Sequence, residues 1–242
     1  MALQLPPPWT LVVPILFLDF LVISLPGGVL PIVINEAFGQ RSYLLVGYAQ
    51  TVKGILAFAT SPAIGSLSDV IGRKYLFLAT IIGTAAPNAA LGLGVSLETH
   101  LVLVGLSGCL AATFPLAFAY IADNVPPQGR SSAFGMAIGL GLGGAFLVGP
   151  PLGALVNERE GSTAVFRACA VITIINIVFL VVVMREPRRP KPPPWHEVLR
   201  RANPFAAFGM LHNNRAMRLL SSIVLFFYLA LWGFLSNKGV CA

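Results

Sequence analysis

The sequence contains six long runs of mostly apolar residues and a seventh near its end. A membrane-spanning helix needs about 20 such residues in succession, and every run comes close to that length. The sequence therefore predicts an all-α, polytopic membrane protein. The runs cover approximately residues 11–34, 43–64, 75–95, 101–122, 132–156, 164–184 and 219–236.

The composition also favours a membrane protein. Hydrophobic residues make up 56% of the chain and charged residues only 10%, whereas a soluble domain carries about 25% charged residues. A water-soluble fold with this composition would expose large apolar patches and aggregate. The net charge of +7 is concentrated in a few loops between apolar runs. It therefore indicates a lipid bilayer, and not a nucleic acid, as the partner.

The distribution of lysine and arginine predicts the orientation of the chain. Cytoplasmic loops of multi-pass proteins carry an excess of these residues. With the N-terminus in the cytoplasm, the cytoplasmic loops hold 11 of the 16 lysine and arginine residues, and the opposite face holds Arg41, Arg159 and Arg167. We therefore expect a cytoplasmic N-terminus.

The apolar runs divide the chain into five parts. We expect a cytoplasmic N-terminus at 1–10, a six-helix unit at 11–184, a basic cytoplasmic linker at 185–218, a seventh helix at 219–236 and a C-terminal segment at 237–242. Within the linker, Trp195, Val198 and Leu199 fall on one helical face, which is typical of a short helix on a membrane surface. The last segment does not begin an eighth helix, which favours a truncated chain.

A short charged turn separates the second and third runs, and it has the pattern G-x-L-x-D-x-x-G-R-K. Gly65 and Gly72 permit close approach of two helices and a tight reversal. Asp69 can cap the N-terminus of the following helix or pair with a basic residue. Arg73 and Lys74 are placed to anchor the start of that helix at the headgroups. A generic positive loop is the simpler alternative.

A second charged pair borders the same predicted cytoplasmic face. Asp123 lies at the end of the fourth run and Arg130 just before the fifth. The Asp123 carboxylate can pair with Arg73 or with Arg130. An exposed pair contributes only about 0–1 kcal/mol to stability. We therefore expect its value to lie in biasing a two-state motion.

The fifth run is rich in glycine and proline. Three glycines recur every four residues and would line one helix face, where a neighbouring backbone can come close: Gly135, Gly139 and Gly143. A second element follows at Gly149, Pro150, Pro151 and Gly153. The prolines are expected to bend the helix. Ordinary packing of small residues is the alternative to a functional motif.

Two ionisable residues lie inside predicted spans. Asp19 is about 12 Å from the cytoplasmic end of the first run, because each helical residue rises about 1.5 Å, and Lys53 lies near the middle of the second. A charged side chain costs about 2.5–3.5 kcal/mol at the membrane centre, so such residues usually pair or line a cavity. We predict that Asp19 and Lys53 face the interior and interact, with Gln50 nearby, as a candidate site for substrate or protons. For Lys53, snorkelling is the alternative.

No constellation of catalytic residues or metal ligands is visible in the sequence. The three cysteines have no metal-binding spacing. His100, His196 and His212 occupy predicted loop or linker positions, where we expect them to be solvated. We therefore expect no enzymatic activity, no cofactor and no metal.

Four segments carry a resemblance to a known family: 50–54 (QTVKG), 63–74 (AIGSLSDVIGRK), 113–123, which ends in YIAD, and 203–206 (NPFA). Together they resemble the hippocampus-abundant-transcript proteins, which are tetracycline-antiporter-like members of the major facilitator superfamily. The glycine and proline element is similar to a helix 5 motif of drug/proton antiporters. The resemblance covers residues 10–235. It implies the N-terminal six-helix half of a major facilitator fold, plus a seventh helix.

The resemblance also implies a function, namely secondary transport of a small organic solute, sugar-like or drug-like, by proton-coupled alternating access. In that superfamily the charged turn acts as a cytoplasmic latch, which here implicates Gly65, Asp69, Gly72, Arg73, Lys74, Asp123 and Arg130. Val104 stands where tetracycline antiporters carry an arginine, so proton coupling at that position is unsupported. Full transporters have twelve helices, so the chain would work with a C-terminal half or as a homodimer. A non-transporting half that binds a membrane partner is the alternative.

Overall fold

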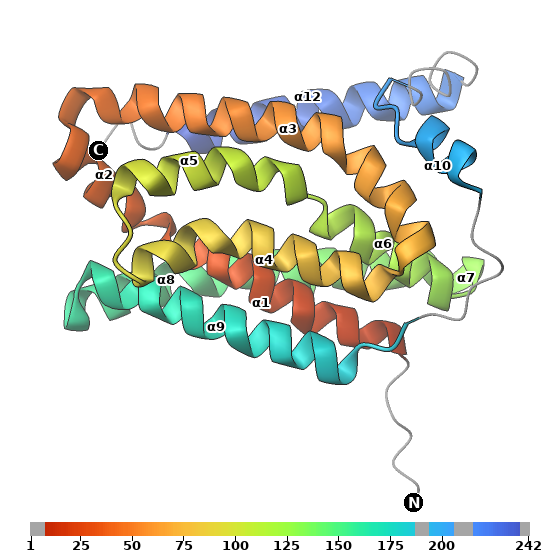
Figure 1. Ribbon diagram of the computed structural model, residues 1–242, viewed down its shortest axis with the longest axis horizontal. Helices are drawn as coiled ribbons and strands as arrows, with labels where there is room; N and C mark the ends of the chain where they lie inside the picture. The colour runs from red at the N-terminus through yellow and green to blue at the C-terminus, as the bar shows by residue number, and fades with distance from the viewer. Residues whose placement is uncertain (1–7, 187–193, 206–214, 238–242) are drawn as a thin grey trace, which may run out of the picture.

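The computed structural model describes residues 8–186, 194–205 and 215–237, and all regular secondary structure in these residues is helical. Figure 1 shows the long helices stacked with their axes roughly aligned. The predicted all-α, multi-pass architecture is confirmed. Expectations for residues 1–7, 187–193, 206–214 and 238–242 lie outside the described residues. Within the part of the chain that the structure describes, six helical segments are long and apolar enough to cross a membrane: Trp9–Gly27, Leu30–Ile71, Arg73–Gly92, Leu97–Asn124, Pro127–Glu160 and Ser162–Val183.

The first apolar run forms two helices, α1 (Val12–Ser24) and α2 (Leu30–Phe38). A 3-10 turn at Leu25–Gly27 separates them. The run at 11–34 is therefore interrupted at its Pro26-Gly27-Gly28 stretch, a sequence typical of a helix break. The proline of this turn has no N–H to donate, and its last glycine is followed by Gly28, so the helix is weakest at this point.

A single residue, Gly72, joins α3 (Ser42–Ile71) to α4 (Arg73–Gly92). Its φ of 126° is a backbone conformation that L side chains rarely adopt, which explains the glycine at the reversal. Gly65, in contrast, lies inside α3, and a Cβ at this position would meet no atom within 4 Å. The predicted close contact at Gly65 was wrong, because the helix continues through most of the charged turn.

The fourth run is interrupted in the middle of the bundle. α5 (Leu97–Ser107) ends in a 3-10 turn at Gly108–Leu110, two non-helical alanines follow, and α6 (Thr113–Asn124) then begins. Pro115 gives the physical reason, because it has no N–H for the carbonyl four residues earlier, in the non-helical stretch. The uninterrupted fourth span predicted from the sequence was wrong here.

The fifth run contains α7 (Pro127–Met136) and α8 (Gly144–Glu160), joined by a π-helical segment at Ala137–Gly143. Glycine at alternate positions of this segment tolerates the wider turns of a π-helix. The two prolines of the run lie inside α8 without ending it. α9 (Ser162–Val183) completes the six spans, and it packs along α4.

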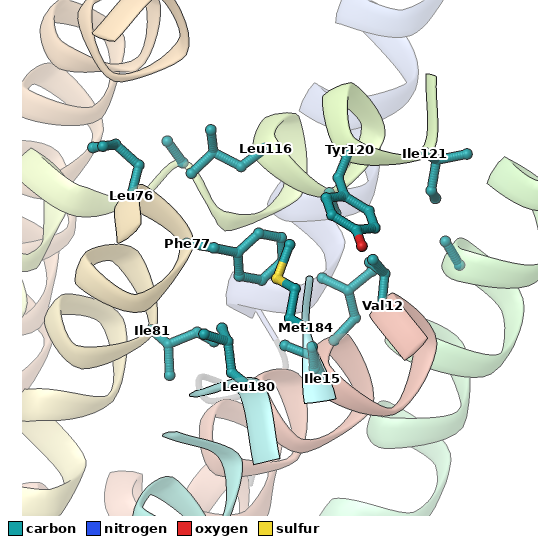
Figure 2. Packing of buried hydrophobic residues seen from close by; sticks show 14 of the residues in the cluster. Val12, Ile15, Leu76, Phe77, Ile81, Leu116, Tyr120, Ile121, Leu180 and Met184 are labelled. Carbon is teal, nitrogen blue, oxygen red and sulfur yellow. The ribbon is translucent and has the colours of Figure 1, made fainter. Parts of the chain in front are cut away.

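The main apolar core lies at the end of the bundle that holds the α3–α4 turn. Figure 2 shows Phe77 of α4, Tyr120 of α6 and Leu180 of α9 converging with Met184. Each of these side chains is at most 1% exposed. The Tyr120 hydroxyl also donates a hydrogen bond of 3.1 Å to the carbonyl of Arg185. The core therefore holds the end of α9 against α4 and α6.

The linker and the last helix lie outside this core. α10 (Trp195–Arg201) packs against α3, and Val198 is buried. Phe205 then lies edge-on against Phe58 of α3, with ring centroids 5.8 Å apart. α12 (Arg215–Asn237) covers the predicted seventh run, and its side chains are exposed from residue 215 to residue 230. The seventh membrane crossing stays a prediction.

Candidate functional site

Asp19 lies in the middle of α1 and is only 2% exposed. The Thr84 hydroxyl of α4 lies 3.2 Å from Asp19 Oδ1. Thr113, the first residue of α6, presents its hydroxyl to the same carboxyl group. Within the described residues, however, neither Asp19 Oδ2 nor Thr113 Oγ1 completes a hydrogen bond. The carboxyl group therefore lies among hydroxyls from two other helices, with one oxygen unpartnered.

Lys53 of α3 is half-buried and interacts electrostatically with Asp19. The two residues do not form an ion pair within 4 Å. Gly108 packs directly on the Lys53 backbone, since a Cβ at Gly108 would lie 2.8 Å from Lys53 Cα. Gln50 is exposed on α3, and no described hydrogen bond joins it to the site. Thr84 and Thr113 are the closer polar neighbours, and the sequence reading missed both.

Two asparagines, of which Asn88 is half-buried and Asn176 is buried, hold α1 in place around this site. Asn88 of α4 donates to the carbonyl of Val22 at 3.0 Å, and Asn176 of α9 donates to the carbonyl of Ile15 at 3.2 Å. These carbonyls lie on either side of Asp19. A buried amide that pairs with a backbone carbonyl fixes the rotation of a helix about its axis. The sequence signal for both residues is a lone polar residue in an apolar run.

Arg73 is the centre of a charged network at the α3–α4 turn. Its guanidinium pairs with Asp69 at 2.6 Å and with Asp123 at 3.1 Å, and it donates a further hydrogen bond to Ser68. Of the two partners considered for Asp123, the structure therefore selects Arg73. Arg130 instead donates to the carbonyls at the end of the fourth span.

Glu186, just after α9, completes this network, which we call the Arg73 network. Its carboxylate accepts the backbone N–H groups of Arg73 at 2.7 Å and of Lys74 at 2.8 Å. A Cβ at Gly72 would lie only 3.1 Å from that carboxylate. The N-terminal cap expected of Asp69 is therefore supplied by Glu186. Sequence reasoning missed it because Glu186 stands at the edge of a basic linker, 113 residues away.

The lysine of the same turn is also tied to α9. Lys74 Nζ donates a hydrogen bond of 2.6 Å to the carbonyl of Val181. Lys74 therefore makes a helix-to-helix contact, while its role as a headgroup anchor stays a prediction. Through Lys74, Glu186 and Tyr120, the end of α9 is bound to both α4 and α6.

The close contacts predicted for the glycine stripe of the fifth span were wrong. A Cβ at Gly135 or Gly139 would meet nothing within 4 Å, and one at Gly143 would meet only the carbonyl of Ile138 in the same segment. These three glycines are exposed. The wide turns of the π-helical segment change the rotation of the helix, so that other glycines face α1.

Gly141 and Gly149 make close contacts with α1, and Gly153 makes one with the turn that follows α1. A Cβ at Gly141 would lie 3.0 Å from Leu16 Cβ, and one at Gly149 would lie 2.9 Å from Ser24 Cβ. At Gly153 an added Cβ would overlap the carbonyl of Leu25. Only glycine allows this approach, which places α8 against the end of α1.

His100 is buried in α5, whereas we expected a solvated loop residue. Its side chain is 1% exposed, and Nδ1 lies 3.0 Å from the carbonyl of Pro87. α5 begins at Leu97, earlier than predicted, and this brings the histidine into the bundle. His196 is exposed and His212 lies outside the described residues. Within the described residues, no group of histidine, cysteine and acidic side chains could hold a metal ion.

A groove of about 380 Å³ lies between α3 and α5, outside the Asp19 site. Its walls are almost entirely apolar and include Tyr48, Val52 and Gly105. Glu98 is the charged residue in the lining. Neither Asp19 nor Lys53 contributes to the groove, so the polar site within the bundle is a separate feature.

Comparisons with known proteins agree with this geometry. The Major Facilitator Superfamily profile matches residues 12–237. Hippocampus abundant transcript 1 protein of Homo sapiens is 30% identical over 219 residues, which is 89% of this chain and 44% of that protein. Multidrug resistance protein 1 of Bacillus subtilis (strain 168) is 29% identical over 176 residues, which is 72% of this chain and 44% of that protein.

The comparison with a solved structure agrees with these sequence comparisons. The crystal structure of the human organic anion transporter MFSD10 superposes with a TM-score of 0.65 at 20% identity, covering 81% of this chain and 54% of that one. At this identity the likeness concerns the fold alone. This chain spans less than half the length of the relatives named above. The profile match and the shared helical architecture show that the chain belongs to the major facilitator superfamily of membrane transporters.

Proposed function

We propose that this chain forms the N-terminal six-helix half of a secondary transporter for a small organic solute. The solute crosses by alternating access, and its movement is coupled to protons. The observation that carries the proposal is Asp19, a carboxyl group that is 2% exposed in the middle of a span. A buried ionisable group at this depth is costly and generally functional.

The Arg73 network is suited to a region that switches between two conformational states. Asp69 and Asp123 come from different spans and meet on one guanidinium, with side chains that are 28% and 33% exposed. Pairs that are this accessible add little to static stability. They can be broken and remade at small cost during a rocking motion. We propose that the network lies on the cytoplasmic side, with the N-terminus in the cytoplasm, as the excess of lysine and arginine there supports.

The substrate class rests on similarity. One relative is named a multidrug resistance protein, and the protein with the similar fold is called an organic anion transporter. Those descriptions belong to those proteins. For this chain we propose a sugar-like or drug-like organic solute that meets Asp19 and Lys53 between this six-helix unit and a second one. The second unit is either another polypeptide segment or another copy of the chain.

A second candidate function is a non-transporting half that binds a membrane partner. The exposed face at Gly135, Gly139 and Gly143 favours it, because glycine lets a neighbouring helix of another subunit approach closely. The exposed side chains of α12 also favour a partner-binding function.

Reconstitution separates these functions. The 242-residue chain is placed in liposomes alone, and also together with a co-expressed C-terminal half of a relative. Uptake of glucose and of ethidium is measured under an imposed pH gradient. The transport proposal predicts uptake that dissipates the gradient, that Asp19→Asn abolishes and that Glu36→Gln leaves unchanged.

Each outcome has a defined meaning. Uptake by the chain alone identifies a half-transporter that works as an oligomer. Uptake only after co-expression identifies a half that needs a second unit. If the folded, inserted chain moves neither probe in either arrangement but is recovered in a stable complex with the co-expressed half, the binding function replaces the transport proposal.

A further inference from the structure

Among the described residues, three buried side-chain oxygen atoms have no hydrogen-bond partner, and two of them belong to one cluster in the bundle. These two are Asp19 Oδ2 and Thr113 Oγ1. The Asp19 side chain is 2% exposed and Thr113 is 5% exposed, so neither is near the surface of the bundle. A buried unpartnered polar atom costs about 1–3 kcal/mol. Two such atoms on residues that face each other indicate an incomplete ligand site.

The Thr84 hydroxyl contacts more than one oxygen atom but has only one hydrogen to donate. Thr84 Oγ1 lies 2.9 Å from the carbonyl of Thr80 and 3.2 Å from Asp19 Oδ1. A hydroxyl has one hydrogen to donate and two lone pairs that accept. When Thr84 donates to Thr80 within its own helix, Asp19 must supply the hydrogen for the contact between them. The contact with Asp19 and the hydrogen bond to the Thr80 carbonyl are made together when Asp19 carries a proton.

The interruption of the fourth span brings Thr113 to this position. The residue before it, Ala112, has φ of −126° and ψ of 19°, which lie outside the α-helical region. α6 therefore starts anew at Thr113, and its first residue faces Asp19. In a continuous helix, the side chain at position 113 would have a different rotation about the axis.

At the other end of the same interruption, Gly108 packs against the backbone of Lys53. A Cβ at Gly108 would lie 2.8 Å from Lys53 Cα and would overlap its carbonyl. Thr60 of α3 donates a hydrogen bond of 3.4 Å to the carbonyl of Gly108. Residues 108–113 therefore connect the backbone of Lys53 with the carboxyl group of Asp19.

The charged surroundings favour a proton over a metal cation. Lys53 of α3 is the charged side chain that acts on Asp19, and α4, α6, α8 and α9, which pack against α1, contribute none among the described residues. An ammonium group repels a second cation at the same carboxylate. A proton avoids this repulsion, because it neutralises the carboxylate by forming an O–H bond.

We propose that Asp19, Thr84 and Thr113 form a binding site for one proton, in which the Thr113 hydroxyl donates to the Asp19 oxygen that Thr84 does not reach. This inference rests on the proposed proton coupling and names residues for it. When the proton binds, an O–H bond forms on Asp19 and donates to Thr84, whose own hydrogen bonds to the Thr80 carbonyl. When the proton leaves to water, that O–H bond breaks and Thr84 turns its hydrogen to the carboxylate.

Infrared spectroscopy of the full chain in liposomes tests the site without any transport. The band of the protonated Asp19 carboxyl is identified by its absence in Asp19→Asn. We expect Thr113→Val to move this band to higher frequency, because the carbonyl oxygen loses a hydrogen-bond donor. Thr113→Ser should restore the original frequency. The matched control is Thr173→Val, since that buried hydroxyl bonds within α9 to the carbonyl of Cys169.

The outcomes separate this inference from the proposed function. A band that Thr113→Val leaves unmoved overturns the role of Thr113 but leaves proton binding at Asp19 intact. No Asp19-dependent band at any pH at which the protein stays folded overturns both. A band that vanishes when sodium replaces choline at equal ionic strength identifies a metal-cation site instead. If Thr113→Val does not insert, Thr113→Ala replaces it with the same expected shift.

Discussion

Glu186 accepts a hydrogen bond of 2.7 Å from the backbone N–H of Arg73, although 113 residues separate them in the chain. The same carboxylate accepts the next amide, that of Lys74, at 2.8 Å. It therefore provides an anion at the N-terminus of α4, where the helix dipole favours negative charge. The contact joins the end of the sixth span to the beginning of the third.

Removing this charge should lower stability. Glu186→Gln keeps one acceptor oxygen but loses the second acceptor and the charge, so we expect a loss of about 1 kcal/mol in the free energy of unfolding. Thermal unfolding of the purified protein in detergent measures it. Glu36→Gln, on the exposed side of α2, is the control and should unfold with the wild type. Equal unfolding temperatures for all three proteins would show that the cap contributes nothing.

The Arg73 network should depend on the guanidinium and not only on positive charge. Arg73→Lys keeps the charge but loses the geometry that serves Asp69 and Asp123 together. We expect a double-mutant cycle between Arg73→Lys and Asp123→Asn to give an interaction of about 1 kcal/mol. Unfolding of the four proteins supplies the cycle, with Arg159→Lys as the control. Strictly additive losses would contradict a direct interaction.

The glycines of the fifth span should respond differently to the same substitution. Gly153→Ala places a methyl group on the carbonyl of Leu25, and we expect a loss of about 2 kcal/mol. Gly139→Ala meets nothing within 4 Å and should be neutral or stabilising by up to about 1 kcal/mol. Unfolding temperatures of the two variants test this contrast. A larger loss for Gly139→Ala would mean that the exposed stripe is a contact surface in the membrane.

Labelling of cysteines tests the orientation. Glu158 and Gln128 are exposed at opposite ends of the fifth span. In a chain whose natural cysteines have been replaced, Glu158→Cys should react with an impermeant maleimide on intact cells. Gln128→Cys should react only after permeabilisation. The reverse pattern would place the N-terminus outside and move the Arg73 network to the opposite face.

The sequence predicted the number and order of the six spans well, because the length of an apolar run is a local property that a bilayer selects directly. It predicted continuity less well. The interruption before α2 falls at Pro26, Gly27 and Gly28, a stretch typical of a helix break. The interruption before α6 depends on Pro115, which has no N–H for the carbonyl four residues earlier. Because prolines are tolerated in many membrane helices, the effect of Pro115 could not be decided from the residue type alone.

Partners across the bundle were harder to predict. Asp19 and Lys53 were recognisable because a charge inside an apolar run is costly wherever it points. Thr84 and Thr113 carry no such signal, since an uncharged hydroxyl is common in helices and can bond to its own backbone. Only the packing of α1 against α4 and α6 shows that both hydroxyls face Asp19.

By itself, the sequence determined that this chain is a multi-pass helical membrane protein with a charged turn between its second and third spans. Those properties follow from composition and from spacing along the chain. The tertiary structure decided that Glu186 caps α4, that Gly153 and not Gly139 packs against the turn after α1, and that Thr113 faces the buried carboxyl group. Each of these depends on the rotation of one helix against another, which is set by side chains far apart in the sequence.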